Sequence, residues 1–168
     1  HALMLNLARI SNDPQAYERA TEFALRSRDG DTALMTARAW LKAFPGSHDA
    51  ARYVIQILVG LNRLEETIEP LRADLAAYPL DQRGAAITDV PRYFARVTDK
   101  KRVAAVVQSA LAPELARGKF AAHVWAAVGT TQLMAADPAS ALKSALNGAR
   151  VEPNNRQIAT LALFLVKA

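Results

Sequence analysis

The fold is decided by residues 125–153, which read WAAVGTTQLMAADPASALKSALNGARVEP. Asp137-Pro138 divides this stretch, and Asp as N-cap before Pro at the first helical position is a strong helix start. On both sides of it, apolar residues recur at helical rather than alternating spacing. We therefore predict one helix over 120–136, a second over 139–151, and a last one that follows Pro153-Asn154-Asn155 and ends at Lys167.

Prolines earlier in the chain repeat a break at a fixed interval. Pro45, Pro79 and Pro113 lie 34 residues apart. The first two close similar phrases, WLKAFP at 40–45 and DLAAYP at 74–79. Since the residue before a proline is pushed out of the α region, each of these prolines predicts the end of a helix.

Helical patterns alternate with short turns between these prolines. The expected helices cover 17–28, 32–44, 48–61 and 64–78, after an opening helix through 3–10. Asp31 is expected to cap the helix over 32–44, and Pro70 to kink the helix over 64–78. Between 80 and 113 the pattern is irregular, and we expect helices over 91–97 and 100–111. No strand is expected, because no segment alternates with a period of two.

The stretch quoted first resembles the tetratricopeptide repeat. Trp125, Val128, Gly129, Ala141 and Pro153 stand at the spacing of its W-x-x-L-G … A … P pattern. The resemblance covers most of residues 15–168, with one good repeat and degenerate ones before it. It implies one all-α domain over 1–168, a solenoid of stacked antiparallel helix pairs. The units then cover about 14–45, 46–79, 80–113 and 120–153, with a terminal helix over 154–167.

Both ends of the chain are apolar. The closing stretch Thr160–Val166 is apolar on every side, whereas the last helix of a repeat array is expected to have a polar outer face. Two interpretations stay open: the array continues in a longer protein, or the terminal helices associate with another copy of the chain.

Composition excludes several classes of protein. The chain has 168 residues, is 51% hydrophobic and contains no cysteine, so disulfides, thiolate metal sites and cysteine nucleophiles are excluded. No apolar run approaches the roughly 20 residues that a membrane span needs. Richness in alanine and arginine is typical of a GC-rich bacterial gene. The compartment stays open between the bacterial cytoplasm and the periplasm or cell envelope.

Positive charge is concentrated in the second half of the chain. Of a net charge of +5, residues 84–168 contribute 11 Lys and Arg against 5 Asp and Glu. The densest group is Arg92, Arg96, Lys100, Lys101 and Arg102, here called the basic cluster. A solvated helix face is the simpler interpretation, and nucleic-acid binding is the alternative. Repeat proteins that read RNA carry base-reading side chains at one position in every repeat, and this sequence has no such series.

No catalytic constellation is evident. The three histidines are far apart, and His48 precedes Asp49 at a helix start, where a capping or surface role is expected. Glu65, Glu66 and Glu69 lie in the first turns of a helix, where negative charge complements the helix dipole. No phosphate-binding, metalloprotease or serine-hydrolase motif occurs. The sequence therefore predicts a protein that is not an enzyme and holds no metal or cofactor.

The resemblance implies a protein–protein interaction scaffold that holds a protein or peptide partner in a concave groove. That groove is lined by the first helix of each pair in the family. Carried over by register, the candidate groove residues are Glu18 and Thr21, then Asp49, Arg52, Gln56 and Val59, then His123, Ala126, Thr130, Leu133 and Met134. The alternatives are a structural or oligomerisation segment of a longer repeat protein, and nucleic-acid binding through residues 92–102.

Overall fold

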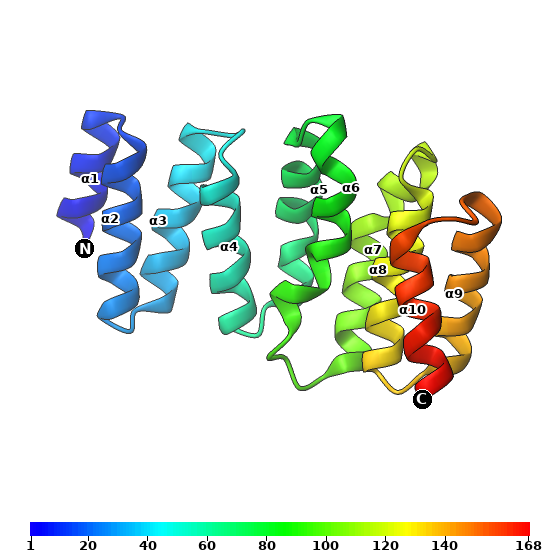
Figure 1. The fold of residues 1–168 in the computed structure, drawn as a ribbon. Helices are drawn as coiled ribbons and strands as arrows, with labels where there is room; N and C mark the ends of the chain where they lie inside the picture. Colours follow the sequence, from blue (N-terminus) through cyan, green and yellow to red (C-terminus); the bar gives the residue numbers. More distant parts are fainter. The chain divides into compact units, whose positions relative to one another are not determined.

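All regular structure in this chain is helical. A computed structural model describes all 168 residues and contains ten α-helices, two short 3₁₀ helices and no strand (Figure 1). Helices account for 82% of the chain, so the prediction of an all-α fold is confirmed. The chain divides into two compact units, His1–Ala77 and Tyr78–Ala168.

Six helical segments form the first unit. They are α1 (Ala2–Ser11), α2 (Pro14–Arg26), α3 (Gly30–Ala43), α4 (His48–Gly60), the 3₁₀ helix η1 (Leu64–Thr67) and α5 (Ile68–Ala77). Each packs against the next along the chain. Asp13, Asp29 and Ser47 begin three of these helices, since each side chain accepts a hydrogen bond from a backbone N–H of the first turn. Such caps satisfy donors that the helix itself leaves unpaired.

Aromatic side chains pack where α2, α3 and α4 meet. The buried Trp40 lies with its ring centroid 5.5 Å from that of Tyr53, and Tyr17 meets Phe44 edge-on at 6.2 Å. Buried alanines such as Ala33 let the helix backbones approach closely. Helices of 10 to 14 residues are marginal in isolation, so this shared core is what stabilises them.

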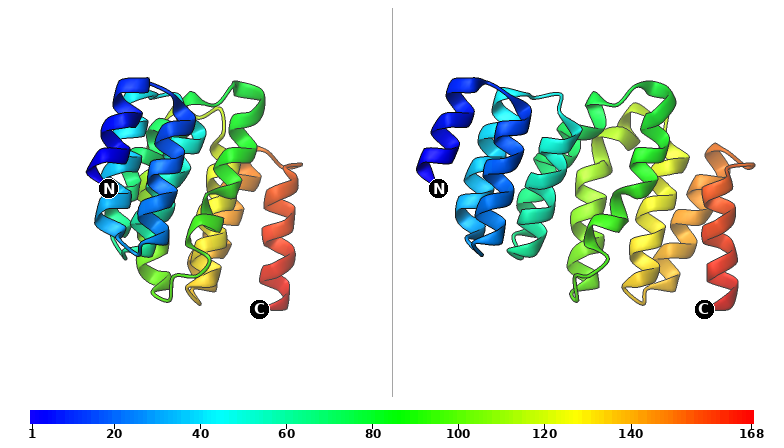
Figure 2. Two further views of the ribbon diagram at one scale, coloured as in Figure 1. Left: turned by 90° about the vertical axis from the view of Figure 1, so that its left-hand side faces the viewer. Right: turned by 60° about the vertical axis from the view of Figure 1, so that its left-hand side comes forward.

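The second unit also has six helical segments, arranged in two layers. They are α6 (Leu80–Asp89), the 3₁₀ helix η2 (Val90–Phe94), α7 (Lys100–Arg117), α8 (Ala121–Met134), α9 (Pro138–Val151) and α10 (Arg156–Lys167). Helix α8 is central, because α6 and α10 flank it in one layer while α7 and α9 pack against it from the other. Helices α6, α8 and α10 run in the same direction, as Figures 1 and 2 show.

Glycines allow the closest helix contacts of the second unit. A Cβ added to Gly129 in α8 would overlap Leu161 of α10 and would lie 3.5 Å from the carbonyl oxygen of Ala141 in α9. A Cβ added to Gly148 in α9 would likewise overlap Ile158 of α10. Gly129 therefore lies where α8 and α10 pack closely, whereas a side chain there would make only an ordinary van der Waals contact with Ala141.

The first corrections concern helix boundaries in the first unit. Asp31 is not the cap of α3. That helix begins at Gly30, two residues before the expected start, and the backbone N–H of Thr32 donates to the side chain of Asp29, which is the cap. The helix expected from residue 17 begins at Pro14, with Asp13 as its cap. The helix expected over 64–78 is two segments, a 3₁₀ turn ending at Thr67 and then α5.

The larger correction concerns residues 80–113. The expected helix over 91–97 is wrong: Leu80–Asp89 is an α-helix and only Val90–Phe94 continues it, as a 3₁₀ turn. The expected end near Pro113 is wrong too, because α7 runs through that proline to Arg117 and ends at Gly118, whose φ is 82°. Proline inside a helix costs about 3 kcal/mol, and burial of the apolar side chains of the preceding turns, such as Ala110 and Leu111, offsets that cost.

Candidate functional site

An open groove of about 420 Å³ lies on the layer formed by α6, α8 and α10 in the second unit. Helix α8 forms its floor, α10 forms one wall, and the end of α6 with η2 forms the other. The lining residues are Thr88, Asp89, Arg92, Ala126, Ala127, Thr130, Leu133, Met134, Gln157, Thr160, Leu161 and Phe164. We call this the α8 groove. Its size falls within the range of small-ligand and side-chain pockets in proteins.

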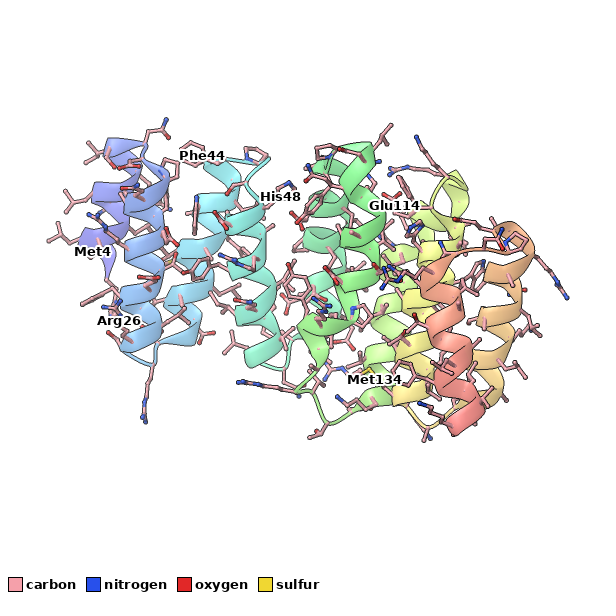
Figure 3. The ribbon with its side chains drawn as sticks, viewed as in Figure 1. Met4, Arg26, Phe44, His48, Glu114 and Met134 are labelled. Atoms are coloured by element: carbon pink, nitrogen blue, oxygen red, sulfur yellow. The ribbon has the colours of Figure 1, made fainter.

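Four of the five groove residues predicted for the best repeat line the α8 groove. They are Ala126, Thr130, Leu133 and Met134, and Figure 3 labels the last of them at the C-terminal end of α8. Ala126 is buried and forms part of the floor, while Met134 is 38% exposed. These four residues therefore lie on one surface of the structure.

His123 does not line the α8 groove. Its imidazole Nε2 would lie 2.8 Å from a Cβ added to Gly84 of α6, and its ring meets Phe120 edge-on at a centroid distance of 5.8 Å. The side chain thus packs between α6 and α8. Its Nδ1 atom is buried and has no hydrogen-bond partner.

Eight further residues of the α8 groove were not among the predicted groove positions. Arg92 was predicted only as part of the basic cluster, and Thr88, Asp89, Ala127 and four residues of α10 were not predicted at all. The apolar stretch at 160–166 was the available signal, because Leu161 and Phe164 come from it. Assigning them to the groove required knowing that α10 packs beside α8.

The first unit has a separate cavity of about 370 Å³ near the end of α4. It is lined by Leu25, Arg28, Gly30, Tyr53, Gln56, Ile57, Gly60 and Leu61. Of the six groove residues predicted for this unit, only Gln56 lines it.

The other predicted groove residues of this unit are engaged elsewhere. Thr21 is 0% exposed and its hydroxyl donates to the carbonyl of Tyr17, so its assignment to a ligand surface is wrong. Asp49 and Arg52 form an exposed ion pair at 3.0 Å. Glu18 and Val59 are half-buried and lie outside the cavity lining.

Two carboxylates surround the hydroxyl of Tyr53. That hydroxyl lies 3.0 Å from Glu22 Oε1, to which it donates, and 3.5 Å from Glu18 Oε1. Burial and the neighbouring carboxylates together raise the pKa of Tyr53 to about 12. Glu22 also accepts a contact from Arg26 at 3.5 Å. These contacts link α2 to α4, and each polar group has a hydrogen-bonding partner among the others.

The basic cluster is partly neutralised by its own surroundings. Arg92 pairs with Asp89 at 3.4 Å, and the Lys100 ammonium donates to the carbonyl of Ala95 at 2.8 Å. Lys101 lies close enough to Asp137 to help lower the pKa of that carboxyl, after the larger effect of the Ser140 hydrogen bonds. Arg96 is exposed, whereas Arg102 is half-buried. No aromatic side chain of this region lines the α8 groove.

His48 has a partner that the sequence did not indicate. Ser47, not His48, caps α4. The His48 side chain, labelled in Figure 3, has its Nδ1 2.6 Å from Oδ1 of the buried Asp74 in α5. Burial raises the pKa of Asp74, and the hydrogen bond and charge of His48 partly oppose that rise. The pair links α4 to α5.

No cluster of three or more His, Cys, Asp or Glu side chains is arranged to hold a metal ion. None of the helices combines the length and the apolar character that crossing a bilayer requires. Carboxylates such as that of Glu66 form ion pairs within the protein: Arg63 and Arg38 donate hydrogen bonds to it at 2.7 and 3.3 Å.

Comparison with known proteins adds no relationship to this geometry. No protein-family model matches the chain, and no curated protein sequence is significantly similar to it.

Proposed function

We propose that this chain is a run of tetratricopeptide-like helical hairpins and that it acts as a non-enzymatic scaffold, binding a protein or peptide in the α8 groove. The observation that carries the proposal is the convergence of Ala126, Thr130, Leu133 and Met134 on one open groove. These residues were selected by repeat register alone. Gly129 and Ala141 lie opposite each other between α8 and α9, which supports the same register, since both are signature positions of that repeat.

The chemistry of the groove suits a partner with apolar side chains. Phe164 is 56% exposed, and together with Met134 and Leu161 it gives the groove apolar walls. Exposed apolar side chains gathered in a concave surface are typical of binding sites. Methionine adapts its shape to different partners, which favours recognition of a peptide over a rigid small molecule.

A selection from a random peptide library displayed on phage tests this function. We expect enriched peptides whose binding is lost in Met134→Glu, because a charge at the groove wall would have to be desolvated. Met35→Glu is the matched control, since Met35 is 50% exposed on α3 and lies outside both cavities. Peptides that bind both variants alike, or the absence of any enriched peptide, would contradict the proposal.

Self-association is a second candidate, supported by a different observation. Leu3, Leu7 and Ile10 form an exposed apolar stripe on α1, and Leu163 and Val166 are exposed on α10. Side chains at such spacing share one face of a helix. If these faces bind another copy, the weight-average mass in sedimentation equilibrium will rise with concentration and fall back to one chain in a Leu7→Lys, Leu163→Lys double variant. A constant mass of 18.2 kDa at all concentrations would exclude it.

A further inference from the structure

Helices α9 and α10 form a hairpin in the second unit, and its main neighbour is α8 (Figure 1). The side of α9 that faces these neighbours consists of small buried residues, among them Ala141, Ala145 and Gly148. A Cβ added to Gly148 would overlap Ile158 of α10, so the two helices pack closely on this side. The opposite side of α9 is exposed to solvent.

Large apolar side chains are exposed on both helices of this hairpin. Leu142 and Leu146 of α9 are each 52% exposed, and Leu163 and Val166 of α10 are 56% and 86% exposed. Each pair is separated by three or four residues, which places its members on one face of their helix. None of the four lines the α8 groove or the cavity of the first unit. Exposed apolar side chains gathered in this way mark a surface that another molecule covers.

Positive charge accompanies these apolar side chains. Residues 138–168 contain four basic residues and a single acidic one, Glu152, whose carboxylate accepts a hydrogen bond from the Asn155 side chain at 3.1 Å. The basic residues are Lys143, Arg150, Arg156 and Lys167, and all four are exposed. None of them forms an ion pair within the chain.

Cations and leucines share one face of α9. Lys143, Leu146 and Arg150 follow one another at i, i+3 and i+7, a spacing that keeps side chains on one side of a helix. We call the four exposed apolar residues and the four basic residues the outer hairpin face. A partner of this face has to offer apolar groups and negative charge within a side chain's length of each other.

An anionic lipid bilayer offers that combination. Its acyl chains take up leucine side chains, and its phosphate groups attract lysine and arginine, whose apolar stems reach from the acyl boundary to the headgroups. A nucleic acid would pair with the cations but leave the leucines in water. A second copy that used the same face would bring cations against cations, which is destabilising.

We propose that the outer hairpin face binds the surface of an anionic lipid bilayer, with α9 and α10 lying along the interface. Leu142 and Leu146 enter the boundary of the acyl chains, and Lys143 and Arg150 contact lipid phosphates. Interfacial helices bury their apolar face about 5–10 Å deep and do not cross the bilayer. This activity goes beyond the proposed scaffold function and uses residues that do not line the α8 groove.

Co-sedimentation of the full chain with lipid vesicles measures this binding. Vesicles of three parts phosphatidylcholine to one part phosphatidylglycerol supply the anionic surface, and pure phosphatidylcholine vesicles are the neutral comparison. We expect retention on the anionic vesicles only, and weaker retention at high salt, because salt screens exposed charges.

Single variants test the two kinds of contact. Lys143→Gln and Arg150→Gln should each weaken binding about fivefold, the factor that corresponds to one basic residue at an anionic surface. Leu142→Gln should weaken it about tenfold, the low end for losing a buried leucine. Arg19→Gln on α2 is the matched control, since Arg19 is exposed and unpaired but lies in the first unit. Because every one of these side chains is exposed, the variants should keep wild-type circular dichroism.

A fluorescent label tests which face enters the bilayer. The chain has no cysteine, so Leu146→Cys and Met35→Cys each create a single labelling site. The two native side chains are similarly exposed, at 52% and 50%. With anionic vesicles, an environment-sensitive dye at position 146 should shift to the blue and be quenched by brominated acyl chains. The same dye at position 35 should do neither.

Contradictory outcomes are specific to this proposal. It is overturned if the chain is not retained on anionic vesicles, if retention is equal on neutral vesicles, or if the Lys143→Gln and Arg150→Gln variants bind like wild type. A blue shift at position 146 that needs only a higher protein concentration would also overturn it and would show that another copy covers this face. Failure of the peptide selection at the α8 groove would leave these measurements unaffected.

Discussion

The imidazole of His48 lies 2.6 Å from the carboxylate of Asp74, which is only 7% exposed. This pair links the start of α4 to α5 in the first unit. Removing one partner of a buried pair leaves the other unsatisfied, which costs more than the pair itself contributes.

We therefore expect His48→Ala to lower the free energy of unfolding by about 1–3 kcal/mol at neutral pH. Burial raises the pKa of Asp74 in the folded protein. Ionised Asp74 therefore destabilises the folded state at pH values above this raised pKa, and the destabilisation disappears at pH values below the pKa of Asp74 in the unfolded chain. The loss of His48 removes the group that opposes this rise.

The difference between wild type and His48→Ala should thus shrink as pH falls through the pKa of Asp74. Urea unfolding at a series of pH values measures it. His48→Ala with Asp74→Asn is the control and should show little of this pH dependence. A difference that stays constant down to pH 3 would contradict the assigned role of Asp74.

Glycine packing in the second unit gives a second prediction. Gly129→Ala and Gly148→Ala should each destabilise the protein by about 1–3 kcal/mol, because the added methyl overlaps Leu161 or Ile158. Gly60→Ala is the matched helical control, since a Cβ there meets nothing within 4 Å. It should leave stability unchanged or raise it slightly, as alanine is the better helix former. Equal effects at all three positions in chemical denaturation would rule out this packing arrangement.

The cap of α3 gives a third prediction, and it separates the structure from the sequence-based assignment. Asp29→Ala should lower the melting temperature, because the Thr32 backbone N–H and hydroxyl both lose their acceptor. Asp31→Ala, two residues later, should change the melting temperature much less. Since hydrogen bonds from Thr32 lower the pKa of Asp29 in the folded state, its stabilising effect should be present above pH 4 and fade as pH falls through its folded-state pKa. The reverse order of the two variants in differential scanning calorimetry would favour Asp31 as the cap.

A fourth prediction concerns Glu66. Its hydrogen bonds with Arg63 lower its pKa to about 2, with a smaller contribution from Arg38. A carboxylate with a lowered folded-state pKa contributes stability that is present above its unfolded value near 4.5 and is lost as pH falls towards 2. Carbon-detected NMR titration should show Glu66 still ionised at pH 3, and Arg63→Gln should move its midpoint upward. An ordinary midpoint in the wild-type protein would show that the pair does not persist in solution.

Much of the helical pattern was predictable because its signals are local. Asp137-Pro138 begins α9, and Asn155 begins α10, as caps and first-turn residues indicate. The two prolines at 45 and 79 also predicted the ends of α3 and α5 to within two residues. These signals depend on a few neighbouring residues, so no tertiary contact was needed to interpret them.

The helix prediction for residues 80–113 failed because tertiary contacts, not local signals, determine the structure there. Pro91 and Pro113 have strong local preferences, but the chain accommodates the first in a 3₁₀ turn and the second inside α7. Packing against α8 decides both outcomes, and that packing is not visible in the local sequence. Thr21 was misassigned for another reason: the α2–α3 turn is three residues long, like the α8–α9 turn, and Thr21 lies on the buried face of α2.

The candidate site was predictable in part. Repeat register selected the floor and the Met134 end of the α8 groove, since residues on one helix face follow from spacing alone. The α10 wall and Arg92 were not predictable in this way, because they lie on other helices that only folding brings next to α8.

Chemical-shift mapping of a bound peptide tests the central claim most directly. With a peptide selected on the full chain and added to the ¹⁵N-labelled protein, we predict the largest amide shifts at 126–134 and 157–164, with smaller ones near 88–92. Those ranges form the surface of the α8 groove. Shifts concentrated instead in the cavity residues of the first unit, or along the exposed stripe of α1, would contradict the assignment of the groove as the binding site.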